Sequence, residues 1–98
     1  MKHLEEVIKE STPTLVVFQH INETNGAAED TIFEELKTKY DGKANLCTVD
    51  CSKNGSYKER YHFAGYPTWI LFKEGQELAR EGGHKTLAQL SAMLDTAL

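Results

Sequence analysis

The run Leu-Val-Val-Phe at residues 15–18 constrains the fold of this chain more than any other feature of the sequence. It is apolar at every position, it contains β-branched residues, and its length is typical of a strand rather than of a helix. Strands that are apolar on both faces occur where helices cover both sides of a sheet. The run therefore predicts the central strand of an α/β domain.

Helix-patterned stretches alternate with strand-like runs along the rest of the chain. A short amphipathic helix ends near Pro13, and the spacing of apolar residues predicts further helices over Ala27–Tyr40 and Ser56–Phe63. A last helix begins at Thr86, with Gln89 three residues later, which is the pattern of a capping box. Further strands are predicted at Leu46–Val49, Thr68–Lys73 and Gln76–Glu81, the last two joined by a tight turn at Glu74-Gly75. The order α-β-α-β-α-β-β-α implies a central mixed β-sheet flanked by helices on both faces.

Length and charge limit the classes of function. The 98 residues fit a single domain over 1–98. Its 11 basic and 15 acidic residues are interspersed and give a net charge of −4, which opposes binding to nucleic acid or to an anionic membrane. No apolar run approaches the roughly 20 residues of a membrane span, and residues 1–6 have no apolar signal-peptide region. We therefore expect a cytoplasmic protein.

Nearly the whole chain resembles the thioredoxin family. The resemblance is carried by the strand that ends at Phe18, the helix segment Thr31–Leu36 and the strand end Cys47–Asp50. It is strongest over Gly65–Gly75, which reads Gly-Tyr-Pro-Thr-Trp-Ile-Leu-Phe-Lys-Glu-Gly and is similar to the family segment that carries a cis-proline. The resemblance implies a thioredoxin-like fold with a cis peptide bond before Pro67.

The Cys-x-x-Cys motif of thiol–disulfide exchange is missing from the place where the family carries it. Counting back without gaps from the predicted helix, the two cysteine positions of the family fall on Glu23 and Gly26, with Thr24 and Asn25 between them. A thiolate at a helix N-terminus is the nucleophile in this chemistry, and neither residue has a sulfur atom. The family's dithiol mechanism is therefore not expected here, and the chain is predicted to be redox-inactive.

Two buried positions of the family change together with the motif. The same count places the family's buried acid on Val17 and its lysine partner on Leu46. A single unpaired charge left in a core costs about 3–5 kcal/mol, whereas an apolar pair packs without that cost. The double replacement is consistent with a core that no longer supports thiol chemistry.

The two cysteines of the chain, Cys47 and Cys51, lie elsewhere. In an extended stretch their Cα atoms are about 13 Å apart, roughly twice the span of a disulfide. This favours free thiols that serve as packing residues. Alternatively, Cys51 lies near the start of the helix at Ser56, whose dipole could activate it as a lone redox thiol, with Cys47 as a weaker candidate. No set of four residues has metal-site spacing, so neither a metal nor another cofactor is expected.

Three functions remain open on these residues. The first is a peptide- or protein-binding module that uses the surface made by Asn22–Gly26, Gly65–Pro67 and Gly82–His84, with Gly65, Tyr66, Pro67 and Gly83 as the candidate peptide-binding residues. The family resemblance implies that the backbone of Tyr66 pairs with the peptide, and main-chain pairing does not need the thiols. The second is a thiol–disulfide oxidoreductase in cell redox homeostasis that works through Cys51 or Cys47. The third is a structural domain that dimerises, with a second subunit covering an exposed apolar surface.

Overall fold

The computed structural model describes residues 4–20, 26–52 and 56–98, and for 26–30 the backbone only. The predicted order of elements is confirmed. The chain forms α1 (Leu4–Val7), β1 (Thr14–Gln19), α2 (Gly26–Lys39), β2 (Asn45–Asp50), α3 (Ser56–Arg60), β3 (Thr68–Lys73), β4 (Gln76–Gly82) and α4 (Leu87–Asp95). Within these ranges, no helix combines the length and the apolar character that crossing a membrane requires.

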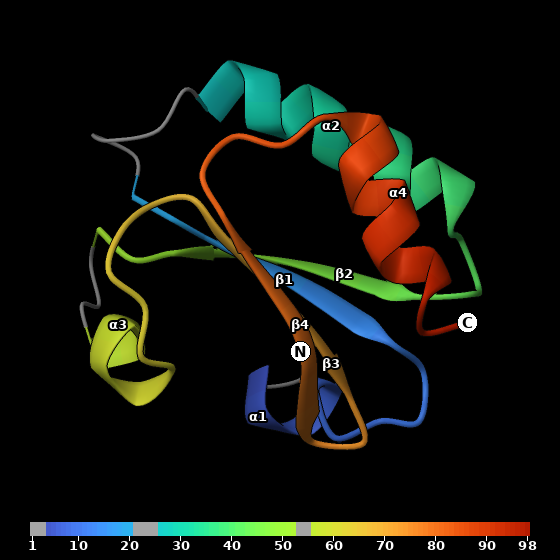
Figure 1. Ribbon diagram of the computed structural model, residues 1–98, viewed down its shortest axis with the longest axis horizontal. Helices are drawn as coiled ribbons and strands as arrows, with labels where there is room; N and C mark the ends of the chain where they lie inside the picture. The colour runs from blue at the N-terminus through green and yellow to red at the C-terminus, as the bar shows by residue number, and fades with distance from the viewer. Residues whose placement is uncertain (1–3, 21–25, 53–55) are drawn as a thin grey trace.

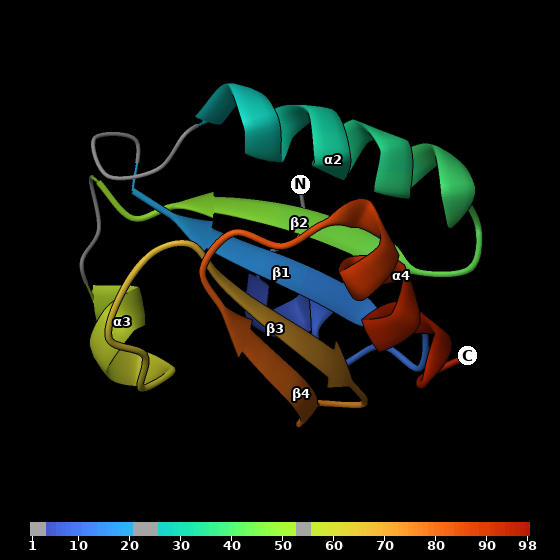
Figure 2. The ribbon, with the colours of Figure 1, turned by 45° about the horizontal axis from the view of Figure 1, so that its top comes forward.

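The strands form one mixed sheet in the order β2-β1-β3-β4. Strand β1 runs parallel to β2 and antiparallel to β3, and β3 and β4 form an antiparallel hairpin. Every residue of β1 is buried, as the apolar run at residues 15–18 predicts for a central strand, whereas β4 is largely exposed. Figures 1 and 2 show α2 and α4 on one face of the sheet and α1 and α3 on the other.

Each face of the sheet carries its own apolar cluster. The cluster beneath α2 and α4 includes Val17 and Trp69, with Leu46 packed against it. Val17 and Leu46 thus lie in one apolar environment, so neither leaves a charge in the core. The cluster on the face of α1 and α3 is built around Phe18, whose ring centroid is 5.0 Å from that of Phe63.

Local signals account for the turns and for one helix end. Glu74 and Gly75 have φ angles of 55° and 81°, the left-handed pair that a type I′ hairpin turn requires. The capping box of α4 forms between Thr86 and Gln89, as predicted. Helix α3 ends at Arg60 rather than at the predicted Phe63. The reason is the backbone at residue 62, which has a φ of 56° and cannot continue a right-handed helix.

Candidate functional site

A groove of about 370 Å³ lies where the loop between α3 and β3 meets the end of β4. Its walls are formed by residues 62–68 together with Arg80, Gly82 and Gly83. The four residues that the sequence suggests for peptide binding, Gly65, Tyr66, Pro67 and Gly83, all belong to this lining. The fold therefore brings these sequence-distant residues together in one concave surface.

Backbone and side-chain hydrogen bonds fix the two sides of the groove. The Tyr66–Pro67 peptide bond is cis. The N–H of Gly83 donates to the Pro67 carbonyl across 2.8 Å and joins the two walls. The Thr68 hydroxyl donates to the Gly65 carbonyl at 2.6 Å, and the Trp69 indole donates to the Gly83 carbonyl at 3.0 Å. The groove is thus bounded by backbone that is held at several points.

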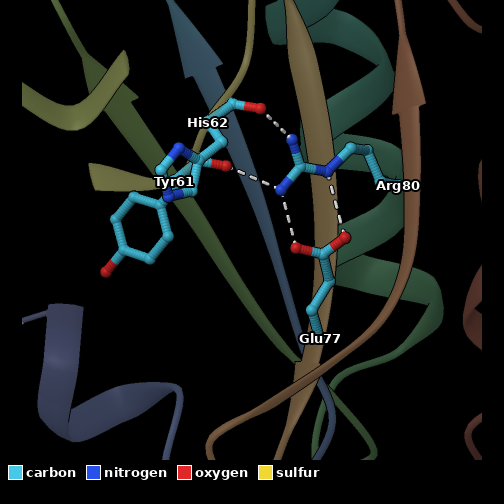
Figure 3. A network of polar contacts seen from close by, with 4 residues as sticks. All are labelled: Tyr61, His62, Glu77 and Arg80. Carbon is cyan, nitrogen blue, oxygen red and sulfur yellow. Dashed lines mark hydrogen bonds and ion pairs between the residues drawn. The ribbon is translucent and has the colours of Figure 1, made fainter. Parts of the chain in front are cut away.

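Arg80 ties β4 to the loop that follows α3 (Figure 3). Its Nη1 donates to the His62 carbonyl at 2.5 Å and its Nη2 to the Tyr61 carbonyl at 2.7 Å. The Glu77 carboxylate accepts from Nε at 3.0 Å and from Nη2 at 2.7 Å, which makes the ion pair bidentate. These hydrogen bonds to Glu77 raise the pKa of Arg80 above its ordinary value, and burial opposes them. Arg80 is therefore a charged clamp on one wall of the groove.

The sequence pattern alone does not predict this clamp. In a regular strand, residues 77 and 80 would point to opposite faces. The pairing of β3 with β4 is irregular, however: Leu71 pairs with Ala79 and Phe72 with Glu77, which leaves Leu78 as an extra residue. This bulge brings Glu77 and Arg80 to the same face of the sheet. The contact between Glu77 and Arg80 can therefore be recognised only from the register of the folded hairpin.

Tyr66 is anchored by side chains from three other segments. Its ring centroid lies 5.5 Å from that of His20 and 5.7 Å from that of Phe63. The Lys58 ammonium is 5.6 Å from the centroid of the same ring. A side-chain hydrogen bond also joins Tyr66 to Cys51. The residue before Pro67 is therefore held in place by packing.

Neither cysteine is suited to be a nucleophile. Cys51 is 3% exposed, and burial raises the pKa of its thiol. The hydrogen bond with Tyr66 acts in the opposite direction, and the charge of Asp50 raises this pKa further. Burial thus acts against the activation of Cys51 that the sequence suggests for the dipole of α3. Cys47 is half-buried, and burial also raises the pKa of its thiol. Both thiols are free, and neither lines the groove.

Only one of the four positions at which the family carries its Cys-x-x-Cys motif is among the described residues. Glu23, Thr24 and Asn25 lie outside the described residues, and Gly26 is the first residue of α2. Over residues 4–20, 26–52 and 56–98, no group of three or more His, Cys, Asp or Glu side chains gathers in a way that could hold a metal ion.

Comparison with known proteins gives a consistent result. The profile of the thioredoxin family, described as "Thioredoxin", matches residues 2–96. Curated proteins named thioredoxin from Staphylococcus aureus strains Mu50, MW2 and N315 are each 34% identical to the chain over 67 residues. The matched stretch is 68% of this chain and 64% of each relative, so the chain covers slightly less than two thirds of their length.

Proposed function

Since the chain belongs to the thioredoxin family, we propose that it is a redox-inactive member that binds extended peptide or unfolded protein segments in the cytoplasm. The binding site in this proposal is the groove formed by residues 62–68, Arg80, Gly82 and Gly83. The observation that carries it is that neither Cys47 nor Cys51 is among the described residues that line this groove. Binding and thiol chemistry are therefore separate in this chain.

The size and lining of the groove suit a short stretch of main chain. Its volume of about 370 Å³ lies at the lower end of the range for small-ligand sites. Phe63, Tyr66 and Pro67 supply apolar surface, and a Cβ added at Gly65 or Gly82 would meet no atom within 4 Å. The glycines thus leave room beside the backbone, as a site for an extended segment needs.

An oxidoreductase that works through Cys51 or Cys47 is less well supported. Raised pKa values lower the fraction of thiolate near neutral pH, and the thiolate is the attacking species. Cys51 is also too buried for a disulfide of a client protein to reach its sulfur. The similarity to proteins named thioredoxin supports membership of the family. It does not by itself support a redox activity of Cys47 or Cys51.

An NMR titration locates the binding site. The probe is insulin B chain with both thiols carboxymethylated, so that no disulfide exchange can contribute. We expect the amide signals of residues 62–66, 68 and 82–83 to shift together and to saturate. Absence of shifts at millimolar peptide, or shifts centred on β2 or on the helices, would count against the groove.

A reduction assay tests the redox part of the proposal. Insulin is reduced by dithiothreitol with and without the protein, and precipitation of the free B chain is followed by turbidity. The expected rate equals that of dithiothreitol alone. Acceleration that disappears in Cys51→Ala would establish that thiol as an active site and would overturn the redox-inactive assignment.

A further inference from the structure

The guanidinium of Arg80 keeps one N–H group that has no acceptor among the residues that the structure describes. An arginine side chain carries five N–H donors. Nε and one N–H of Nη2 donate to Glu77, and the other N–H of Nη2 donates to the Tyr61 carbonyl. One N–H of Nη1 donates to the His62 carbonyl. The second N–H of Nη1 is therefore available to a ligand.

This N–H group is at the end of the guanidinium that borders the groove. Glu77 binds at Nε and Nη2, so Nη1 lies on the side away from the carboxylate (Figure 3). Arg80 and His62 meet at Nη1 and both line the groove, whereas neither Glu77 nor Tyr61 is among the described residues that line it. An acceptor of a bound peptide can therefore reach Nη1 without displacing Glu77.

The charges around the groove favour an anionic acceptor. The described residues of its lining include no Asp or Glu, although the chain as a whole has a net charge of −4. Glu81, next to Arg80 in β4, forms an ion pair with Lys85 at 3.4 Å instead. A carboxylate that enters the groove therefore meets a donor on Arg80 and no acidic side chain of the described lining.

Lys58 adds a second positive charge beside the groove. Its ammonium lies 5.6 Å from the centroid of the Tyr66 ring, and Tyr66 is part of the lining. Lys58 is exposed, and the described part of the chain gives it no ion-pair partner. At about 0.1 M salt, charges attract over roughly 10 Å before screening removes the effect. Lys58 is thus expected to strengthen the attraction of a carboxylate to this wall.

We propose that the groove prefers extended segments with an internal Glu or Asp, whose side-chain carboxylate accepts a hydrogen bond from Nη1 of Arg80. The inference rests on the proposed function, because it assigns a class of peptide to the same groove. A hydrogen bond from arginine to a carboxylate is stronger than one to a neutral amide. An internal side chain is the source, since a segment that passes through the groove presents side chains there and not its terminus.

Matched peptides test this preference on the whole protein. Two peptides, blocked at both ends, are identical except for one central residue, which is Glu in the first and Gln in the second. Fluorescence anisotropy should show that the Glu peptide binds at least about fivefold more tightly at low salt, and that the difference shrinks at high salt. A third peptide has the central Gln and a free C-terminal carboxylate, and it should bind like the blocked Gln peptide.

Three variants identify the residue that binds the carboxylate. The quantity compared is the ratio of the Kd values of the Gln and Glu peptides, because a loosened loop weakens both peptides alike. Arg80→Met should bring this ratio close to one. Glu77→Gln keeps Arg80 and removes the neighbouring negative charge, so the ratio should rise. Lys58→Gln should lower the ratio in part. If Arg80→Met fails to fold, the opposite changes in the other two variants still decide the proposal.

The outcomes separate this proposal from peptide binding itself. Equal affinity of the Glu and Gln peptides, with groove amides that shift for both, would overturn the preference and leave the groove as the binding site. Absence of groove shifts with either peptide would overturn both proposals. A ratio that is unchanged in Arg80→Met would place the carboxylate on another residue. Binding of the third peptide as tight as that of the Glu peptide would show that the groove takes a chain terminus instead.

Discussion

The indole nitrogen of Trp69 donates a hydrogen bond to the carbonyl of Gly83 across 3.0 Å, and so links the sheet to the rim of the groove. Trp69 is fully buried in β3, while Gly83 follows β4 with a left-handed φ of 84°. Trp69 is the one tryptophan of the chain. Its fluorescence is therefore expected to change when the backbone at Gly83 moves or binds a peptide.

Replacing this indole tests the link. Trp69→Phe deletes the donor, leaves the Gly83 carbonyl without this partner and creates a small cavity, so we expect a loss of about 2–3 kcal/mol of unfolding free energy. Urea unfolding followed by far-UV circular dichroism measures it, since the fluorophore is gone. Amide exchange near Gly83 should also become faster. If the variant were as stable as wild type, the hydrogen bond from Trp69 to Gly83 would contribute nothing to the unfolding free energy.

The Arg80 clamp gives a second prediction. Arg80→Met removes the donors to the Tyr61 and His62 carbonyls, and we expect a loss of about 1 kcal/mol, because the guanidinium is partly exposed. Peptide affinity should fall as the loop loosens. Glu77→Gln is the matched control, since it keeps the bonds to both carbonyls and loses only the ion pair, so its effect should be smaller. If both variants lost the same unfolding free energy, the stabilisation would come from the ion pair with Glu77 and not from the hydrogen bonds to the loop.

The elements of the fold could be predicted because each has a local signal. The buried run at residues 15–18 places β1, the Glu74-Gly75 pair places the hairpin, and Thr86 with Gln89 places the start of α4. Each of these features is decided by residues that are close in sequence. The end of α3 was predicted less well, because the left-handed backbone at His62 has no signature in the side chain that carries it.

The site could be predicted only in part. The lining residues Gly65, Tyr66, Pro67 and Gly83 followed from the family resemblance, and the structure places them in one groove. Arg80 could not be found, because its role depends on a bulge and on a loop that is distant in sequence. The burial of Cys51 likewise depends on contacts across the sheet.

The capping box of α4 allows a clean stability test. Thr86 accepts from the Gln89 N–H at 3.1 Å, and Gln89 Oε1 accepts from the Thr86 N–H at 2.9 Å. We expect Thr86→Ala to lower the unfolding free energy by about 1 kcal/mol. Thr38→Ala, inside α2, is the control: the Thr38 hydroxyl bonds to the Glu34 carbonyl, and alanine there should be neutral or slightly stabilising. A larger loss at Thr38 than at Thr86 would contradict the capping assignment.

The thiols make stability depend on pH in a predictable direction. In the folded protein the pKa values of Cys47 and Cys51 are raised above their ordinary value of 9.0, so the unfolded chain releases these protons first. The stabilisation is complete below about pH 9 and is lost as the pH rises above it. Urea unfolding at pH 8, 9 and 10 should show this decline, and Cys47→Ala/Cys51→Ala should show less of it. Parallel declines in the two proteins would contradict the assignment.

Above pH 10 the tyrosines add to the same trend. Burial raises the pKa values of Tyr40 and Tyr61 above their ordinary value of 10.0. The comparison of the cysteine variants is therefore sharpest near pH 9, where the tyrosines are still largely protonated in both states.

The most direct test of thiol-independent binding in the groove is the affinity of a fluorescently labelled, carboxymethylated insulin B chain, measured by anisotropy. Gly65→Val adds a branched side chain to the groove lining at a position where a Cβ would meet no atom within 4 Å, and it should weaken binding at least about tenfold. Leu78→Val, on an exposed residue outside the groove, and the variant without cysteines should bind within about twofold of wild type. Unchanged affinity in Gly65→Val, or loss of binding with the cysteines, would contradict the account.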